Sequence, residues 1–578
     1  MKDFVKMMLA VICAFIVMGI LRFLFFLLFL GSAALGSSTP AIPKTGAVLD
    51  LNMADFTLAE QTNSEPVPQF SLMGGISTTM ASVGIRDAVK ALEEAANDPA
   101  ITFAYLRADF ASAGIAQLEE FRKALVAFRA SGKPILAYTE SPSNGSYYLA
   151  SVADKILMGK AHGGTYQLVG LSTQLMFLKD ILDKLGVNVQ LIRHGKYKSA
   201  GEMFIRNSSS PENREQNQVM INSMWAAMAA PMAASRDLPV ERFNQLIDEL
   251  SFVVPEDFEK HGLVDELVDH EDLEKKICTL AQVEDIKRVH LVPLADYVDA
   301  KVSEGVAKDK VAVIYAEGEI VDGDATSEVS GDRFVRIIEK VRKDKNVKAV
   351  VLRVNSPGGS VSASVKIRTA LDKLMAEKPL VASYGDYAAS GGYWISSGCQ
   401  KIYADATCLT GSIGVFSMIP EFSQVAKKVG VGIETVGSNK HSDMLSLMRP
   451  FDAAETAYMQ ASVEDIYELF VNLVASSRGK TTEEIDAIAQ GRVWAATDAL
   501  SIGLVDEIGT LEDAISYAAA LADLTSSDAY SVVGYPAPPT FMQQIMEQFG
   551  GNKEDISVFL NYEPGRMYAR IPYDYKIR

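Results

Sequence analysis

An internal repeat spans most of the chain and constrains its fold more than any other feature. FAYLRADF in the first half aligns with AVVLRVNS in the second, so that Leu106 and Arg107 correspond to Leu352 and Arg353. At the same spacing NGSYYLASVADKI aligns with SGGYWISSGCQKI, and HGLVDEL and IGLVDEI close the two copies after a small shift. Self-similarity in a fixed order indicates a duplicated unit. Chance likeness between strand-and-helix segments would not preserve the order of so many matches.

Each copy is predicted to have an α/β architecture. Short β-branched runs such as VKAVVLRV and PLVASY alternate with segments of helical spacing such as VSASVKIRTALDKLMAE. This alternation is typical of a largely parallel sheet covered by helices, in which sites form at the strand ends. We place a membrane anchor and linker at residues 1–45, the first copy at 46–305, the second copy at 306–535 and a tail at 536–578.

The N-terminal segment predicts a membrane anchor. Residues 7–30 are apolar except for Arg22, and as a helix they would be about 36 Å long, enough to cross a bilayer core of about 30 Å. A cleaved signal peptide usually has an apolar run of only about 7–15 residues, although the following SAALGSS could serve as a cleavage region. Lys2 and Lys6 precede the span, so the positive-inside rule keeps the N-terminus in the cytoplasm and exports the body.

Composition argues against several classes of partner. The net charge of −18 leaves no basic block that could neutralise phosphates, so we expect no nucleic-acid partner. Four cysteines are too few for a disulfide framework in a chain of this length. The sequence has neither a paired-cysteine metal pattern nor an HExxH motif, and we expect no metal and no cofactor.

The second copy contains two loops suited to nucleophilic catalysis. In GDYAASGGYW, Ser390 stands between alanines and glycines that leave its hydroxyl uncovered. In NSPGGSV, Gly358 and Gly359 would let backbone N–H groups point at a developing oxyanion. Each loop alone could be an ordinary strand-to-helix turn. Together they supply a hydroxyl and the donors that its reaction would need.

The first copy has lost both features. It has FASA where the second copy has SPGG, and Asn144 where the second copy has Ser390. An asparagine side chain cannot act as an acyl-forming nucleophile, so we expect this half to be chemically silent at the matching position.

The first copy nevertheless offers a base. The chain has only six histidines, none of them near Ser390 in the sequence, whereas RHGKYKSAGEMF carries Lys198. The corresponding GSNKHSDMLSL of the second copy has no matching lysine. Burial can lower a lysine pKa by 3–5 units from about 10.4, which would let a neutral amine accept the serine proton. On spacing alone an ordinary solvated lysine would be the better interpretation of Lys198. The complementary losses in the two copies favour a Ser–Lys pair instead, with a hydroxyl of TGSIGV orienting the amine.

With these residues in view, the chain resembles the S49-type serine peptidase family, in the long, two-copy bacterial form of the signal peptide peptidase A (protease IV) type. The resemblance covers nearly the whole chain and rests on NSPGGSV, GDYAASGGYW, LTGSIGV, GKYKSA and GRVWAATDALSIGLVDEIG. It implies that Ser390 is the nucleophile, that Lys198 is the general base and that Ser412 holds the lysine. It also implies that the backbone N–H groups of Gly359 and Gly391 form the oxyanion hole.

The resemblance further implies tandem ClpP/crotonase-like domains and a homotetramer on the outer face of the bacterial cytoplasmic membrane. The implied activity is the degradation of cleaved signal peptides and other apolar peptides. Two other classes remain open on the residues: an acyl-CoA enzyme of the crotonase type, and a membrane-tethered scaffold or chaperone with a degenerate cleft.

Overall fold

The computed structural model describes residues 42–62, 68–71, 75–78, 81–302, 305–326, 328–538 and 567–571. The predicted anchor at residues 7–30 lies outside these ranges, as does most of the predicted tail. Within the described ranges, none of the helices reaches the length and hydrophobicity that a bilayer-crossing helix requires.

The first copy is built on a fully parallel six-stranded sheet. Its strands, in spatial order, are β10 (Glu266–Val268), β8 (Lys155–Gly159), β7 (Ile135–Thr139), β6 (Ile101–Arg107), β1 (Ala47–Asn52) and β11 (His290–Pro293). The helices and short strands around it are β2 (Phe56–Ala59), β3 (Pro68–Ser71), β4 (Gly75–Thr78), β5 (Ala81–Gly84), α2 (Ile85–Asn97), α3 (Ile115–Ala130), α4 (Asn144–Ala150), α7 (Pro211–Ala234), α8 (Val240–Asp248), α9 (Pro255–Lys260), α10 (His270–Ala281) and α11 (Leu294–Lys301).

The second copy repeats this strand order. The matching strands are β22 (Glu507–Ile508), β18 (Ile402–Ala404), β17 (Leu380–Ala389), β15 (Val347–Ser356), β12 (Lys310–Glu317) and β23 (Ser531–Tyr535). β19 (Leu409–Gly411) and β21 (Val493–Ala495) extend the sheet beside the end of β17. The helices are α12 (Gly331–Lys343), α13 (Val361–Met375), α14 (Gly391–Ser396), α15 (Ser423–Lys428), α16 (Ala453–Arg478), α17 (Thr482–Ile488), α18 (Ala496–Ser501) and α19 (Leu511–Leu521). The duplication and the α/β architecture predicted from the sequence are confirmed.

Hydrophobic patterning explains why these strands are central. β15 is buried along almost its whole length, as expected for a parallel strand covered on both faces. α12 buries Phe334, Ile338 and Val341, which lie on one face of the helix at a spacing of three to four residues, and exposes its charged side chains. Each sheet therefore packs between amphipathic helices.

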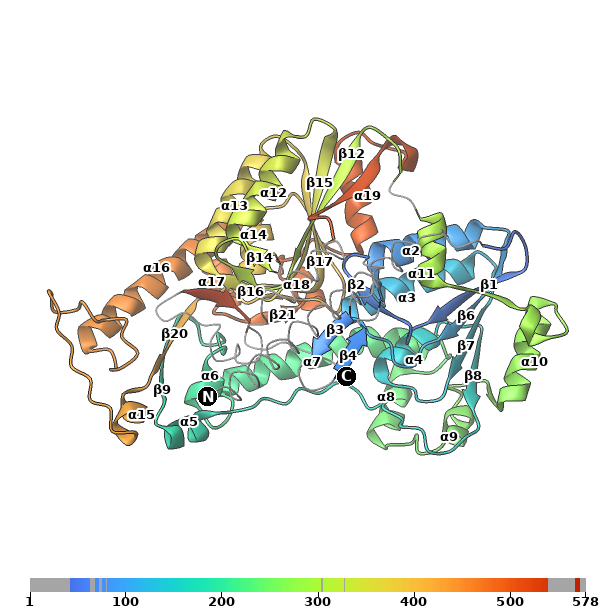
Figure 1. Cartoon of the computed structure of the whole chain (residues 1–578), viewed down its shortest axis with the longest axis horizontal. Coiled ribbons are helices and arrows are strands. Elements are labelled where there is room, and N and C mark those ends of the chain that lie inside the picture. The colour runs from blue at the N-terminus through green and yellow to red at the C-terminus, as the bar shows by residue number, and fades with distance from the viewer. Residues whose placement is uncertain are drawn as a thin grey trace, which may run out of the picture.

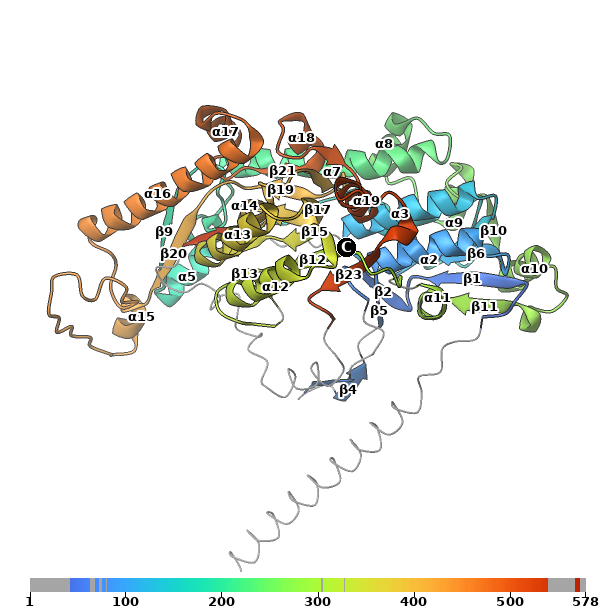
Figure 2. The same cartoon turned by 90° about the horizontal axis from the view of Figure 1, so that it is seen from above.

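A third sheet joins the two copies. Its order is β14 (Val329–Ser330), β13 (Ile320–Val321), β16 (Gly358–Ser360), β24 (Tyr568–Arg570), β20 (Phe416–Glu421) and β9 (Asn188–Arg193). In Figure 1 the first copy (blue to green) lies beside the second (yellow to red), and α5 (Lys179–Leu185), α6 (Glu202–Ile205) and β9 reach under the second copy next to β20. Figure 2 shows α3 of the first copy next to β17 of the second.

A buried ion network also crosses between the copies. The guanidinium of Arg353 lies 2.8 Å from Glu60 and 2.8 Å from Glu120, and all three side chains are buried. Its repeat counterpart, Arg107, pairs with Asp50 of its own copy at 2.7 Å. The duplicated arginine has thus acquired partners from the other half, which ties β15 to the first copy.

Candidate active site

Ser390 lies at a sharp turn between a strand and a helix. β17 ends at Ala389 and α14 begins at Gly391, and the serine between them has φ +56° and ψ −111°. Its backbone N–H donates to the Gly411 carbonyl at 2.8 Å, which holds the turn against β19. A positive φ is uncommon for a non-glycine residue and persists only where the surroundings enforce it. The fold therefore presents this hydroxyl in a fixed direction.

Lys198 reaches Ser390 from the other copy. The lysine follows β9, which is paired with β20 of the second copy, and this pairing brings its loop next to α14. The Lys198 Nζ atom lies 2.8 Å from the Ser390 Oγ atom. It also donates to the Ser412 carbonyl and approaches the Ser412 Oγ, both at 3.0 Å. The structure brings together the three side chains that the sequence singled out.

Burial lowers the pKa of Lys198. Its side chain has no exposed surface, and this desolvation holds the pKa of the amine well below its usual value. A neutral amine has two N–H groups and one lone pair. If its two N–H groups donate to the two oxygens of Ser412, its lone pair can accept the Ser390 hydroxyl proton. The arrangement matches a general base and its nucleophile.

The two predicted oxyanion donors lie near each other. Gly358 and Gly359 have φ values of +97° and +156°, which only glycine adopts readily. A Cβ atom placed on Gly391 would lie 3.1 Å from the Gly359 nitrogen. The N–H groups of Gly359 and Gly391 therefore sit close together beside the Ser390 turn, in a position suited to a shared oxyanion.

The sequence analysis did not identify two residues that position Lys198. Gly491 has φ +78°, and a Cβ there would lie 2.6 Å from the Lys198 backbone nitrogen and 2.5 Å from its Cβ. Gln216 of α7 donates to the Tyr197 carbonyl at 3.1 Å and to the Ser199 hydroxyl at 3.0 Å. In the sequence Gly491 is only a lone glycine at the start of GRVWAA. The sequence alone does not show that the Lys198 backbone packs against this glycine.

The matching position of the first copy has a structural role. Asn144 is buried at the start of α4, and its side-chain oxygen accepts from Val169 N and Gly170 N, each at 3.1 Å. Its amide nitrogen donates to the Gly170 carbonyl at 2.9 Å. The side chain that replaces the serine therefore ties down a loop.

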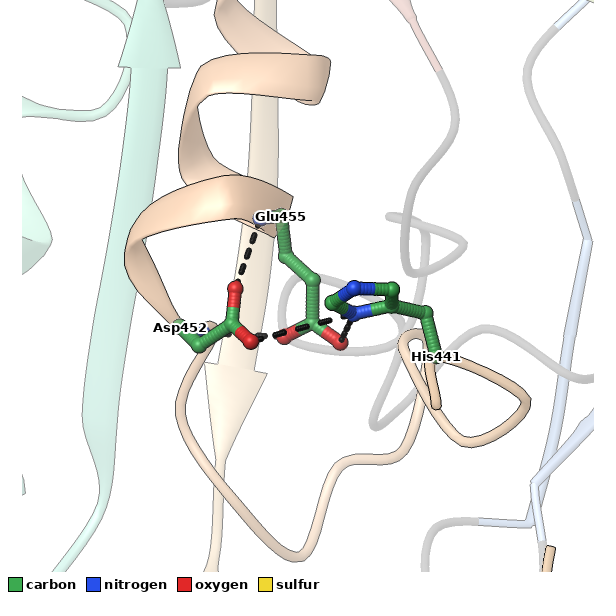
Figure 3. A group of neighbouring side chains, drawn as sticks. All are labelled: His441, Asp452 and Glu455. Atoms are coloured by element: carbon green, nitrogen blue, oxygen red, sulfur yellow. Dashed lines mark hydrogen bonds and ion pairs between the residues drawn. The ribbon is translucent and has the colours of Figure 1, made fainter. Parts of the chain in front are cut away.

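A second polar cluster does not suit a metal. His441, Asp452 and Glu455 lie within 4.8 Å of one another (Figure 3). Arg449, however, binds both carboxylate oxygens of Glu455 at 2.7 Å, and one of these oxygens also accepts from the Asp452 backbone at 2.9 Å. The guanidinium already supplies the positive charge that a cation would bring, so this cluster is an ion-pair network at the start of α16.

Comparison with known proteins fits this geometry. The profile of peptidase family S49 matches residues 127–284 and 372–525, one segment in each copy. Protease 4 of Haemophilus influenzae is 36% identical over 450 residues, covering 76% of this chain and 73% of the relative. Protease 4 of Salmonella typhi is 37% identical over 492 residues, covering 83% and 78%. The chain belongs to peptidase family S49.

A plant protease and a solved structure are also similar to this chain. The chloroplastic serine protease SPPA of Arabidopsis thaliana is 31% identical over 479 residues, covering 79% of this chain and 69% of that one. Among solved structures, a ClpP1 mutant from Listeria monocytogenes aligns with a TM-score of 0.24 and 14% identity over 35% of this chain and 94% of its own. The S49 membership and the named proteases make this chain a serine peptidase. The acyl-CoA and scaffold alternatives are set aside.

Proposed function

We propose that the chain is a membrane-anchored serine endopeptidase that works through a Ser390–Lys198 dyad divided between its two copies. The observation that carries the proposal is the 2.8 Å contact between the Lys198 Nζ and the Ser390 Oγ, which joins a buried amine from one half to a hydroxyl from the other. Relatives at more than 30% identity over most of the chain are named as proteases, which supports peptide hydrolysis as the reaction.

The proposed mechanism has two halves. Lys198 takes the proton of the Ser390 hydroxyl as the oxygen attacks the peptide carbonyl, and the oxyanion accepts hydrogen bonds from Gly359 N and Gly391 N. The protonated lysine then delivers its proton to the leaving amine, which leaves an ester on Ser390. A water molecule, deprotonated by the same amine, hydrolyses the ester and restores the enzyme. Ser412 acts as a positioning residue, because its two oxygens fix the amine.

We further propose that the substrates are cleaved signal peptides and other apolar peptides at the outer face of the cytoplasmic membrane. The apolar segment at residues 7–30 supports an anchor there, with a cytoplasmic N-terminus and an exported body. A relative in Enterococcus faecium, 35% identical over 218 residues, is named a putative signal peptide peptidase. Tandem ClpP/crotonase-like domains and a homotetramer complete the proposal.

A serine-reactive fluorophosphonate probe tests the dyad. The intact protein should be labelled at Ser390, and Ser390→Ala should abolish both the labelling and peptide hydrolysis. Lys198→Ala should slow hydrolysis by about 10²–10⁴-fold, the usual contribution of a general base. Lys196→Ala is the matched control, since this neighbouring lysine is exposed and points at the Tyr197 ring. A folded protein that neither takes up the probe nor cuts any peptide would refute the proposal.

A further inference from the structure

The strand that leads to Ser390 contains a bulge just before the serine. The parallel register between β15 and β17 shifts between Val354 and Ser356. Asn355 alone therefore stands opposite three residues of β17, 385–387. A bulge bends its strand, and bulges beside active sites redirect the side chains that follow them. The shape of this bulge therefore sets the direction from which the chain reaches Ser390.

The side chain of Asn355 replaces the ladder hydrogen bond that the bulge removes. Its Oδ1 accepts from Tyr387 N at 3.2 Å, three residues before Ser390. Its Nδ2 donates at 3.1 Å to the Oε1 of Glu60, a residue of the first copy. The backbone carbonyl of Asn355 accepts from Gly318 N at 3.0 Å, which fixes the main chain as well. One amide thus joins the approach to Ser390 to a carboxylate of the other copy.

Glu60 is itself held firmly in place. Its side chain is buried, and its Oε2 accepts from Arg353 Nε at 2.8 Å. Its Oε1 also accepts from Gln117 Nε2 at 3.2 Å. A Cβ atom placed on Gly385, in the bulge, would lie 2.8 Å from this Oε1 atom. The carboxylate therefore packs directly against the bulge and offers Asn355 a fixed acceptor.

The matching position of the first copy shows what the second copy has added. Asp109 corresponds to Asn355 at the spacing of the repeat. Its Oδ2 accepts from Ser141 N at 3.0 Å, and Ser141 occupies the position that matches Tyr387. A carboxylate can hold the strand end in this way, but it has no N–H group to donate to a second carboxylate. The asparagine keeps the contact with its own strand and gains a donor for Glu60.

We propose that Glu60 and Asn355 are a positioning pair through which the first copy holds Ser390 in its reactive place. The inference rests on the proposed dyad. The pair acts through Tyr387 N and through the backbone of Asn355, which lies four residues before Gly359. It therefore fixes the hydroxyl and one proposed oxyanion donor relative to each other. Such preorganisation costs nothing at the moment of reaction. The first copy then contributes more than the proposed base.

The Asn355→Asp variant tests the pair. It keeps an acceptor for Tyr387 N but sets a second carboxylate against Glu60, and like charges repel at this distance. We expect kcat for a short apolar peptide and the rate of fluorophosphonate labelling to fall by about 10²-fold, as for a displacement of about 1 Å at a reacting group. KM should change by less than about three-fold, because the displaced contacts form only in the transition state.

The double variant Glu60→Gln/Asn355→Asp separates positioning from general damage to the fold. It returns one amide and one carboxylate to the contact in exchanged places, with the same formal charge. It should recover kcat at least about ten-fold over Asn355→Asp, since residues in direct contact are not additive. Independent damage by the two substitutions would add instead. If Asn355→Asp does not fold, Glu60→Gln and the double variant decide: the first should show the kcat loss and the second should reverse it.

Asp109→Asn is the matched control. It makes the reverse exchange in the first copy, where the carboxylate also accepts from Thr139 and from Glu140 N. It should lower the melting temperature and leave kcat unchanged. A folded single variant of the pair with wild-type kcat, or a double variant no better than the single variants, would overturn the positioning role. Wild-type protein that neither takes up the probe nor cuts a peptide would instead overturn the proposed function.

Discussion

Lys198 is a charged residue type in a place that disfavours charge. It has no exposed surface, and burial is what lowers its pKa. A nearby carboxylate would raise the pKa again and keep the amine protonated. Its partners are instead hydroxyl and carbonyl oxygens of Ser390 and Ser412, which hold an uncharged amine without fixing a proton on it.

Replacing Lys198 with methionine should separate stability from activity. Hydrolysis should fall by about 10²–10⁴-fold with the loss of the base. Between the lowered pKa of the folded state and the usual pKa near 10.5, the unfolded wild-type chain binds the additional proton, so wild-type stability rises with pH across that window. The Lys198→Met variant lacks this pH-dependent contribution to the free energy of unfolding. Its melting temperature should therefore exceed that of the wild type by a few degrees at pH 7, and the difference should shrink toward pH 10.

If Lys198 is the general base, its lowered pKa should also govern how the rate of the wild-type enzyme depends on pH. Hydrolysis of a short peptide should rise with pH as Lys198 loses its proton and level off above its lowered pKa. Measuring kcat/KM from pH 5 to 9 checks this expectation. A flat profile, or a variant Lys198→Met that melts below the wild type at pH 7, would contradict a neutral buried amine.

The sequence singled out Ser390 and Lys198 because the losses in the two copies were complementary. Asn144 in place of Ser390, and the missing lysine in the second copy, were visible by alignment of the repeat. The residues that pack around Ser390 and Lys198 could not be found by aligning the repeat. The contact of Gly491 with Lys198 depends on tertiary packing. The pairing of β24 with β16 depends on it too. The sequence analysis placed these residues in a tail, because three residues are too few to show the alternating pattern of a strand.

The loop that carries Lys198 is positioned by elements of the second copy. β9 pairs with β20 over its whole length, and Gly491, just before β21, lies against the lysine backbone. Tyr197 N donates to the Gln490 carbonyl at 2.9 Å, and Gly491 N donates to the Ile413 carbonyl at 2.8 Å. The proposed base therefore belongs to the first copy in the sequence, but contacts with the second copy hold it in position.

Gly491→Ala should impair catalysis through the position of this loop. A methyl group there would meet the Lys198 backbone, which has to move. A displacement of about 1 Å at a reacting group can cost about 10²-fold in rate, so we expect a loss of that order in kcat. Gly479→Ala is the matched control: it has φ +62°, but nothing lies within 4 Å of its Cβ position. Equal activity losses in the two variants would point to backbone strain alone and contradict the positioning role.

The relative placement of the two copies decides whether the proposed site can exist, because each copy supplies one member of the proposed dyad. α3 of the first copy meets the second copy through carboxylates: Glu119 accepts from Ala406 N and Thr407 N at 3.1 Å. Asp386, which precedes Ser390 by only four residues in the sequence, accepts a hydrogen bond from Ala116 N at 2.9 Å. Acidic side chains thus hold the interface between the copies next to Ser390, and their protonation should affect the stability of that interface.

Asp386 provides the clearest test of this dependence. Burial, the largest influence, raises the pKa of its carboxyl from 3.8 to about 6. The folded state therefore keeps a proton that the unfolded state has lost, and the stability due to Asp386 is complete below about pH 3.8 and lost as the pH rises through about 6. Relative to Asp386→Asn, which does not titrate, the wild type should lose up to about 3 kcal/mol between pH 4 and 7. Partial exposure of the side chain makes this an upper bound.

Urea unfolding of the two proteins across this pH range measures the difference directly. Asp465→Asn, at a solvent-exposed position on α16, should follow the wild type at every pH and controls for the loss of one formal charge. The stability difference between the wild type and Asp386→Asn could instead stay constant from pH 4 to 7. That result would mean that the Asp386 carboxyl has the same pKa in the folded and the unfolded protein. The contact between Asp386 and α3 would then be a hydrogen bond at the interface without pH dependence.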